Sequence, residues 1–362
     1  MHKPKLSITI PTWNRAVLLE EQILLLSEQI IKNDLSKKIE IVISDNGSDD
    51  STQNIILNIL EKYDFIIYHN NEINKGARYN LLKALDLANG EYSIFLGDDD
   101  RYKIDGLKKM IDCIEKHNQI DAIFDSHLFK RNKFKQPTFV SLDQLLENFY
   151  YNIGNAGVFI IRTSLLQANI NKFGYNYFSL SWPQTQLIIL SLNHNDSKKI
   201  LLADLDLFNN SVHDQVMMYN SYYLLRGLYF DLADAIDSIK TEIALSNYNS
   251  ARQFLKNQIL QNTFNVLQCG VYVDNYDYRK KTIDYIKLHK SKFSFEEQFF
   301  LTIALIVLSL PIWLSRILSD IFIFTTRGKR GLEKKNNFVT RELQKLQNKN
   351  INKSIRTFDF TT

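Results

Sequence analysis

The chain has 362 residues, of which 45% are hydrophobic and 23% charged, and it contains only 12 Gly and 5 Pro. This composition is that of a folded protein with a sizeable core, and it excludes wholesale disorder and long flexible linkers. The net charge of +4 suits an anionic membrane surface or an anionic substrate. No basic stretch interleaved with aromatic residues is present, so nucleic acid is not expected as a partner.

The two cysteines and the N-terminus bear on the compartment. Cys113 and Cys269 each lie in an apolar, helix-like stretch, so a disulfide framework is not expected and a reducing cytoplasm is the default. The sequence begins MHKPKLSITIP, which has a short apolar strand rather than the apolar core of a signal peptide. Secretion is therefore not indicated.

Residues 6–125 alternate short β-branched runs with stretches of helical periodicity. This alternation is typical of a largely parallel sheet with crossover helices. The expected strands are 6–10, 39–43, 65–68, 92–96 and 122–124, and the expected helices are 17–31, 51–62, 77–88 and 105–117. In the last helix, Leu107, Met110, Ile111 and Ile114 form one apolar stripe that faces a sheet.

The pattern changes after this α/β region. Residues 126–210 are loop-rich, with further strands expected at 157–162 and 200–203, and residues 215–290 have helical apolar periodicity. We therefore expect an α/β domain over 1–215, a helical region over 216–295, an apolar membrane-associating segment over 296–326 and a polar, basic tail over 327–362.

The apolar segment contains an uncharged run from Phe299 to Leu314. This run is shorter than the roughly 20 residues that a spanning helix needs, and Pro311 interrupts it. It could span a bilayer, lie in the interface or form a re-entrant hairpin, and a buried core helix is the alternative. The basic residues 327–330 favour an anionic cytoplasmic leaflet. The sequence therefore predicts a location at the cytoplasmic face of the membrane, either peripheral or with one C-terminal membrane segment.

Polar clusters follow the first four expected strands, at 11–15, 44–50, 70–78 and 98–100. In such sheets, ligands bind at the carboxyl ends of the strands. Asp98, Asp99 and Asp100 would repel one another unless a cation or hydrogen-bond donors compensate them, and hard Mg²⁺ or Mn²⁺ prefers such oxygen ligands. A solvated acidic turn is the alternative.

The other clusters favour a nucleotide diphosphate. Asp45 and Asn46 present an acceptor and an amide of the kind that reads a nucleobase edge, although an Asx turn would use the same residues. Arg15 and Arg78 have the fork geometry that binds phosphate, although either could be a simple surface charge. The segment 74–76, which contains Lys75 and Gly76, precedes a helix N-terminus, where anions are favoured.

With these motifs in order, the chain resembles the family 2 glycosyltransferases of the GT-A fold, and possibly their abequosyltransferase-like branch. The matching stretches are SITIPTWNR (7–15), IVISDNGSDDST (41–52), NKGARYN (74–80) and ANGEYSIFLGDDD (88–100). The resemblance is specific over the first third of the chain and only an outline over the middle third. It implies a mixed, mainly parallel Rossmann-like sheet that binds a nucleotide sugar.

The resemblance also implies roles for individual residues. Pro11, Thr12 and Arg15 would line the nucleotide pocket, Asp45 and Asn46 would contact the base, and Arg78 would lie near the ribose or diphosphate. Asp98 would contact the ribose, and Asp99 and Asp100 would hold Mn²⁺ or Mg²⁺ against the diphosphate. Because some members supply a late histidine as a further ligand, His213 is also a candidate metal ligand.

The acceptor side departs from the family pattern. Inverting members place a catalytic Asp or Glu there, but none occurs between Asn148 and Asn195. Three explanations stay open: a base elsewhere, with Asp125 and Asp196 as candidates; a retaining mechanism without such a base; and loss of activity. Tyr177, Trp182 and Gln184 are the candidate acceptor-region residues; the aromatic pair could stack on a sugar ring or pack in the core.

The sequence thus predicts a metal-dependent glycosyltransferase that uses a nucleotide-sugar donor and a lipid-linked glycan acceptor at a membrane surface. The product would be a bacterial-type surface polysaccharide. A catalytically silent, glycan- or sugar-nucleotide-binding scaffold is the main alternative. A nucleotidyltransferase would need a Gly-rich phosphate loop, which 11–15 is not. A hydrolase is disfavoured because the carboxylates are contiguous rather than facing each other across a cleft.

Overall fold

The structure is a computed structural model that describes residues 3–117, 119–127, 137–148, 155–193, 199–208, 225–274 and 276–321, with 323, 325 and 336. The chain divides into two compact units. Unit 1 comprises Met1–His213 with Ala235–Ala251, and unit 2 comprises Asp214–Asp234 with Arg252–Thr362. The candidate nucleotide residues that the structure describes all belong to unit 1.

Unit 1 is built on an eight-stranded sheet within the described residues, in the order β3-β2-β1-β4-β7-β5-β8-β6. Strands β1, β2, β3 and β4 are mutually parallel, β7 is antiparallel to its neighbours β4 and β5, and β6 is antiparallel to β8. The strands are β1 (Leu6–Thr12), β2 (Ile39–Asp45), β3 (Ile66–Asn70), β4 (Tyr92–Phe95), β5 (Ala122–Asp125), β6 (Thr138–Val140), β7 (Phe159–Arg162) and β8 (Ile200–Ala203). The prediction of a mixed, mainly parallel sheet is confirmed.

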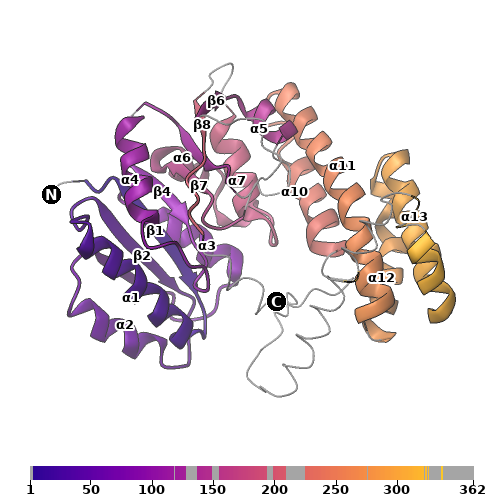
Figure 1. The fold of residues 1–362 in the computed structure, drawn as a ribbon, viewed down its shortest axis with the longest axis horizontal. Helices are drawn as coiled ribbons and strands as arrows, with labels where there is room; N and C mark the ends of the chain where they lie inside the picture. The colour runs from indigo at the N-terminus through magenta and orange to yellow at the C-terminus, as the bar shows by residue number, and fades with distance from the viewer. Residues whose placement is uncertain are drawn as a thin grey trace. The chain divides into compact units, whose positions relative to one another are not determined.

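Helices cover both faces of this sheet (Figure 1). The helices of unit 1 are α1 (Ala16–Lys32), α2 (Thr52–Leu60), α3 (Ala77–Asp86), α4 (Gly106–Lys116), α5 (Leu142–Asn148), α6 (Thr163–Phe173), the 3-10 turn η1 (Tyr175–Tyr177) and α7 (Pro183–Leu192). Helices α1, α2 and α4 share one apolar core with the sheet, whereas α3 packs with α6 and α7. The predicted stripe of α4 is buried in that core, because all four of its apolar residues are at most 1% exposed.

A buried carboxylate organises the amino-terminal edge of the sheet. Glu40 of β2 is 6% exposed and accepts hydrogen bonds from Ser7 Oγ (2.5 Å), Asn89 N (2.6 Å) and Gly90 N (3.1 Å). It therefore ties β1 and β2 to the turn that precedes β4. This contact lies at the opposite edge of the sheet from the predicted nucleotide site.

Unit 2 is helical in its described residues. Its elements are the π-helical turns η2 (Arg226–Asp231) and η3 (Cys269–Val273), α12 (Tyr276–His289), the 3-10 turn η4 (Lys290–Lys292), α13 (Phe295–Ser309) and a helical stretch at 312–321. Two helices, α10 (Leu232–Ser238) and α11 (Leu245–Gln268), contribute residues to both units.

The predicted apolar segment folds as two helices rather than one. Helix α13 ends where Leu310 adopts an extended conformation, and Pro311 separates it from 312–321. Arg279 hydrogen-bonds to the groups at this break, since it donates to Leu308 O (2.7 Å), Leu310 O (2.6 Å) and Ser315 Oγ (2.7 Å). Among the residues described, no helix combines the length and the apolar character needed to cross a bilayer.

Candidate active site

The carboxyl ends of β1, β2 and β3 are held in register at one edge of the sheet. Thr12 pairs with Asp45, and Asp45 pairs with Asn70. Asn80 of α3 lies beneath this edge, 3% exposed, where its Nδ2 donates to Thr12 O (3.1 Å) and its Oδ1 accepts from Asn71 Nδ2 (3.0 Å). The predicted clusters after these strands are therefore joined by one buried amide.

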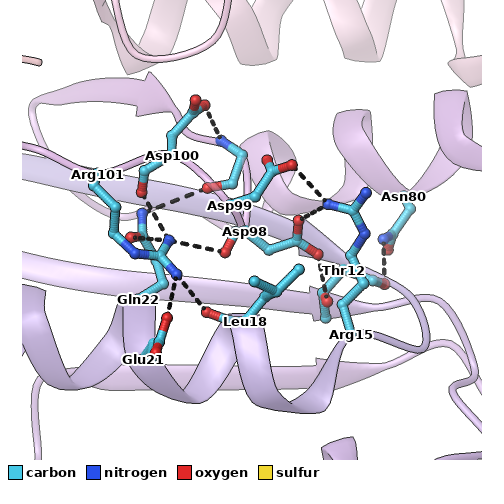
Figure 2. Close-up of polar contacts among 11 residues, drawn as sticks. Thr12, Arg15, Leu18, Glu21, Gln22, Asn80, Asp98, Asp99, Asp100 and Arg101 are labelled. Carbon is cyan, nitrogen blue, oxygen red and sulfur yellow. Dashed lines mark hydrogen bonds and ion pairs between the residues drawn. The ribbon is translucent and has the colours of Figure 1, made fainter. Parts of the chain in front are cut away.

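The acidic loop after β4 contacts the end of β1 directly. Asp98 is 6% exposed, and its two carboxylate oxygens accept from Thr12 Oγ1 (2.9 Å) and Arg15 Nη1 (2.7 Å). The same Arg15 nitrogen lies 3.1 Å from Asp99 Oδ2. Figure 2 shows Asp98 and Asp99 both pointing toward Arg15, which stands at the start of α1. The predicted grouping of residues from the first and fourth strand ends is thus present.

The pKa values follow from this close packing. Burial raises the pKa of the Asp98 carboxyl, and the neighbouring charge of Asp99 adds to the rise, against the opposing effect of Arg15. Burial alone would lower the pKa of Arg15, but the charges of Asp98 and Asp99 raise it overall. Arg15 therefore stays charged and neutralises part of the acidic loop.

Asp100 is oriented differently from the other two carboxylates. It is 4% exposed, its Oδ2 accepts from Gly97 N (3.0 Å), and its side chain points away from Arg15 (Figure 2). Asp98 and Asp99 therefore form one pair around Arg15, while Asp100 closes the turn of the loop.

The carboxylate oxygens of the acidic loop are ligands that a hard divalent cation prefers. In this structure the positive charge beside them is that of Arg15. Within the described part of the chain, no group of three or more His, Cys, Asp or Glu is gathered to hold a metal ion. Mg²⁺ commonly uses only one or two carboxylates together with substrate phosphates. Asp99 bonds through Oδ2, which leaves its Oδ1 for a cation. The residues present therefore fit a cation that is shared with a bound diphosphate.

The side chain of Asp45 organises the loop after β2. Asp45 is fully buried; its Oδ1 accepts from Ser48 N (3.0 Å) and Ser48 Oγ (2.6 Å), and its Oδ2 accepts from Tyr68 Oη (2.8 Å). Asn46 Nδ2 donates to Asn74 Oδ1 (2.7 Å), and Asn46 Oδ1 accepts from the backbone N–H of Lys75 (2.9 Å). These contacts join the loop after β2 to the segment before α3, and base recognition by Asp45 and Asn46 stays a prediction.

The segment before α3 provides the backbone that was predicted to face an anion. Gly76 has a φ of +85°, and Lys75 is exposed with Nζ 4.9 Å from the centre of the Tyr79 ring. Arg78 donates to Asn176 Oδ1 (3.0 Å) and Phe178 O (3.1 Å). In this structure Arg78 therefore anchors the turn around η1, while its predicted contact with a diphosphate stays a prediction.

The candidate acceptor-region residues lie around η1 and the start of α7. Tyr177 stacks on Phe173 with 4.3 Å between ring centres, which supports the packing interpretation for this tyrosine. Trp182 precedes α7, and Gln184 lines a small cavity together with Phe95 at the end of β4. Of these three residues, Gln184 is thus the one that the cavity connects with the strand carrying the acidic loop.

The candidate bases differ in how the structure places them. Asp125 is 1% exposed and accepts from the backbone N–H groups of His127 (3.0 Å), Leu205 (3.1 Å) and Leu207 (3.2 Å), so it organises the ends of β5 and β8. Its role as a base stays a prediction. Asp196 and the candidate metal ligand His213 lie outside the described residues.

Sequence reasoning did not single out two residues that join the site. Asn80 is the last residue of the NKGARYN stretch, and Arg101 directly follows the three aspartates. Both are buried, and both bond to the backbone of the site. Asn80 lies within a quoted motif and Arg101 directly follows one, which was a signal, but Thr12 and Gln22, to which they bond, lie far away in sequence.

Comparison with known proteins assigns this part of the chain. Residues 7–168 match the model of glycosyl transferase family 2. Over 98 residues, 27% of this chain and 30% of the relative, the chain is 41% identical to a GalNAc(5)-diNAcBac-PP-undecaprenol beta-1,3-glucosyltransferase of Campylobacter jejuni. Over 103 residues, 28% of this chain and 30% of the relative, it is 40% identical to abequosyltransferase RfbV of Salmonella typhimurium. The matched segments thus span less than a third of these relatives.

Solved structures agree on the fold over most of the chain. The crystal structure of S. aureus TarS 1-349 is similar with a TM-score of 0.55 and 18% identity, covering 95% of this chain and 92% of TarS. TarS 1-349 in complex with UDP-GlcNAc gives a TM-score of 0.56 and 18% identity, covering 88% and 91%. Residues 7–168 therefore match glycosyl transferase family 2 in sequence, and the similarity to TarS shows a shared fold.

Proposed function

We propose that this chain is a metal-dependent glycosyltransferase that moves a hexosyl or deoxyhexosyl unit from a nucleotide sugar to a lipid-linked glycan. The observation that carries the proposal is the joined edge of β1 and β4, where Thr12 and Arg15 hold Asp98 in place. The family 2 match over the same residues supports a nucleotide sugar as the donor. The product would be a surface polysaccharide of the bacterial type.

The proposed reaction breaks the bond between the anomeric carbon and the diphosphate oxygen, while an acceptor hydroxyl oxygen forms the new bond to that carbon. The proton of this hydroxyl passes to a base. The identity of that base stays open, and so does the inversion or retention of the anomeric configuration. A divalent cation, Mn²⁺ or Mg²⁺ on Asp99 and Asp100, would neutralise the departing diphosphate. Arg15, whose Nη1 contacts Asp98 and Asp99, has the guanidinium geometry that binds a phosphate oxygen.

The lipid-linked acceptor is supported by one relative, which is named for an undecaprenol-linked substrate. The deoxyhexosyl unit is supported by another, which is named for abequosyl transfer. Unit 2 adds a physical reason. Phe295, Phe299 and Ile306 are 87%, 56% and 54% exposed on α13, and Trp313 and Ile317 are 63% and 50% exposed on the next helix. Residues spaced by four or seven share a helix face, so each helix carries an exposed apolar stripe.

Such stripes suit a membrane interface, in which apolar faces insert among the lipid head groups without crossing the bilayer. The proposed location is therefore the cytoplasmic face of the membrane, held peripherally. Binding to anionic phospholipid vesicles should weaken in a Phe299→Ser, Trp313→Ser double variant. A Leu245→Ser variant is the control, since Leu245 is 69% exposed but belongs to unit 1. Equal binding of both variants would refute the membrane assignment.

The donor can be identified by thermal unfolding with a panel of nucleotide sugars in the presence of Mn²⁺ or Mg²⁺. A donor at about 100 times its Kd stabilises the folded state by about 2.7 kcal/mol. The stabilising donor should then support transfer of its sugar to a polyprenol-linked acceptor, and Asp99→Asn should remove this transfer. If no nucleotide sugar raises the melting temperature with either metal, the proposed function fails.

A second candidate function is a catalytically silent homologue that binds a sugar nucleotide or glycan as a scaffold. No Asp or Glu occurs between Asn148 and Asn195, and Trp182, Pro183 and Gln184 stand at the start of α7. The expected acceptor region therefore offers no carboxylate base, which favours this alternative. Detectable transfer, or slow metal-dependent hydrolysis of the stabilising donor, would eliminate it.

A further inference from the structure

Arg101 lies behind the acidic loop, on the side away from Arg15. It is 8% exposed, and its guanidinium points into the space between the loop and α1 (Figure 2). Its Nη1 donates to Asp98 O (3.2 Å) and Asp100 O (3.0 Å), so one nitrogen holds two backbone carbonyls of the loop. The side chain therefore contacts the backbone that carries the three carboxylates, not the carboxylates themselves.

The other side of the guanidinium is fixed by α1. Arg101 Nη1 donates to Gln22 Oε1 (2.8 Å), and Nη2 donates to Leu18 O (3.1 Å) and Glu21 Oε2 (3.2 Å). Gln22 is 1% exposed, and its Nε2 approaches Gly97 O at 3.4 Å. Arg101 and Gln22 thus connect three carbonyls of the loop with the first turns of α1.

Helix α1 consequently contacts the acidic loop at two places. Arg15, at its start, bonds to the carboxylates of Asp98 and Asp99, while Gln22 and Arg101 hold the loop backbone from behind. A buried charge needs such satisfied partners, since an unpaired one is costly. A planar guanidinium can serve several carbonyls in fixed directions, which a lysine ammonium cannot do equally well.

We propose that Arg101, together with Gln22, is a positioning residue that fixes the acidic loop against α1. It thereby sets the carboxylates of Asp99 and Asp100 for a cation and that of Asp98 for the nucleotide. The inference rests on the proposed function for its ligand, but the fixing of the loop can be measured without one. Arg101 itself touches no substrate in this assignment.

A matched control is available at the opposite edge of the sheet. Arg162, at the end of β7, is also partly buried and donates to Tyr92 Oη (2.8 Å) and Ile120 O (2.8 Å). An Arg162→Gln variant should lower the melting temperature while leaving the acidic loop and its ligands unaffected. It therefore separates general loss of stability from loss of loop positioning.

The test compares full-length wild type with Arg101→Gln, Arg101→Lys and Arg162→Gln by hydrogen exchange and by calorimetry. In Arg101→Gln, the peptide covering residues 97–101 should exchange about tenfold faster, whereas the same peptide in Arg162→Gln should match wild type. Titration with UDP or GDP and Mn²⁺ should show affinity reduced about tenfold in Arg101→Gln, partly restored in Arg101→Lys and unchanged in Arg162→Gln.

Two results would overturn the inference: unchanged exchange of residues 97–101 in Arg101→Gln, or an affinity loss no larger than that of Arg162→Gln. If wild type binds neither UDP nor GDP, the exchange measurement alone decides whether Arg101 fixes the loop, and the panel of nucleotide sugars decides the proposed function.

Discussion

Replacing Arg15 by methionine removes the positive charge that holds Asp98 and Asp99 together. Arg15 Nη1 lies 2.7 Å from Asp98 Oδ1 and 3.1 Å from Asp99 Oδ2, and the Asp98 side chain is only 8% exposed. Removing one partner of a fully buried ion pair destabilises a protein by about 3–5 kcal/mol. Because 20% of the Arg15 side chain is exposed, we expect a smaller loss of about 2–3 kcal/mol near neutral pH.

The loss should depend on pH in a defined direction. Burial already raises the pKa of Asp98, and loss of the Arg15 charge raises it further in the folded variant. A carboxyl whose pKa is higher in the folded than in the unfolded state contributes stability at low pH that is lost as the pH rises through the folded pKa. The penalty in Arg15→Met should therefore shrink between about pH 7.5 and about pH 5, as Asp98 becomes protonated.

Urea denaturation of wild type and Arg15→Met at both pH values measures this change in the free energy of unfolding. Lys108→Met is the control, because Lys108 forms an exposed pair with Asp112 whose loss should cost less than about 1 kcal/mol. An Arg15→Met penalty that is equal at both pH values, or no larger than that of the control, would refute the electrostatic account of the acidic loop.

Three further substitutions or modifications test the structure around the site. Gly157 has a φ of +74°, and a Cβ there would lie 2.4 Å from Phe208 Cζ, so Gly157→Ala should destabilise unit 1 by about 2–4 kcal/mol in urea denaturation. Gly174→Ala, at a φ of +72° with open space around it, should cost only about 1–2 kcal/mol, and equal losses would contradict the predicted clash. Glu40→Ala should cost about 2–4 kcal/mol, because it leaves the buried Ser7 hydroxyl and the backbone N–H of Asn89 without their acceptor, and a melting temperature within error of wild type would refute this. Burial raises the pKa of the Cys113 thiol to about 11. In a variant whose other cysteine is replaced by serine, the rate at which the folded protein is alkylated should therefore keep increasing above about pH 9. A rate that levels off near the ordinary thiol pKa would contradict this prediction.

The α/β region was predictable because its signals are local. The β-branched runs of β1 and β2 and the apolar stripe of α4 follow directly from residue type and spacing. The common direction of the first four strands then places their polar ends at one edge, which is why the grouping of the polar clusters there could be expected from the sequence. β1 and β2 extend further than the apolar runs, to Thr12 and Asp45, because the backbone ladder continues through polar residues.

The partners within the site were not predictable, because they depend on contacts between distant segments. Arg78 was interpreted as a phosphate ligand from its charge and position, but its bonds to Asn176 and Phe178 arise from the packing of α3 near η1. Asn80 and Arg101 likewise bond to backbone groups, which no residue pattern marks. Asp45 was interpreted as a base contact or an Asx turn, and its bonds to Ser48 show that it holds the loop after β2.

The apolar segment illustrates a different limit. Its composition alone was compatible with a spanning helix, an interfacial helix and a core helix. Pro311 removes a backbone donor and ends α13, and Arg279, which lies on another helix, satisfies the carbonyls freed there. The break between the two helices of the segment is therefore satisfied by a residue outside it.

The central claim is that the acidic loop binds a nucleoside diphosphate together with a divalent cation. Calorimetric titration of UDP and GDP into wild type and Asp99→Asn, each with and without Mn²⁺, tests it most directly. The account predicts that wild type binds at least one of the two nucleotides only when Mn²⁺ is present, and that Asp99→Asn loses this binding. Binding that is equally tight without the metal, or undiminished in Asp99→Asn, would contradict it.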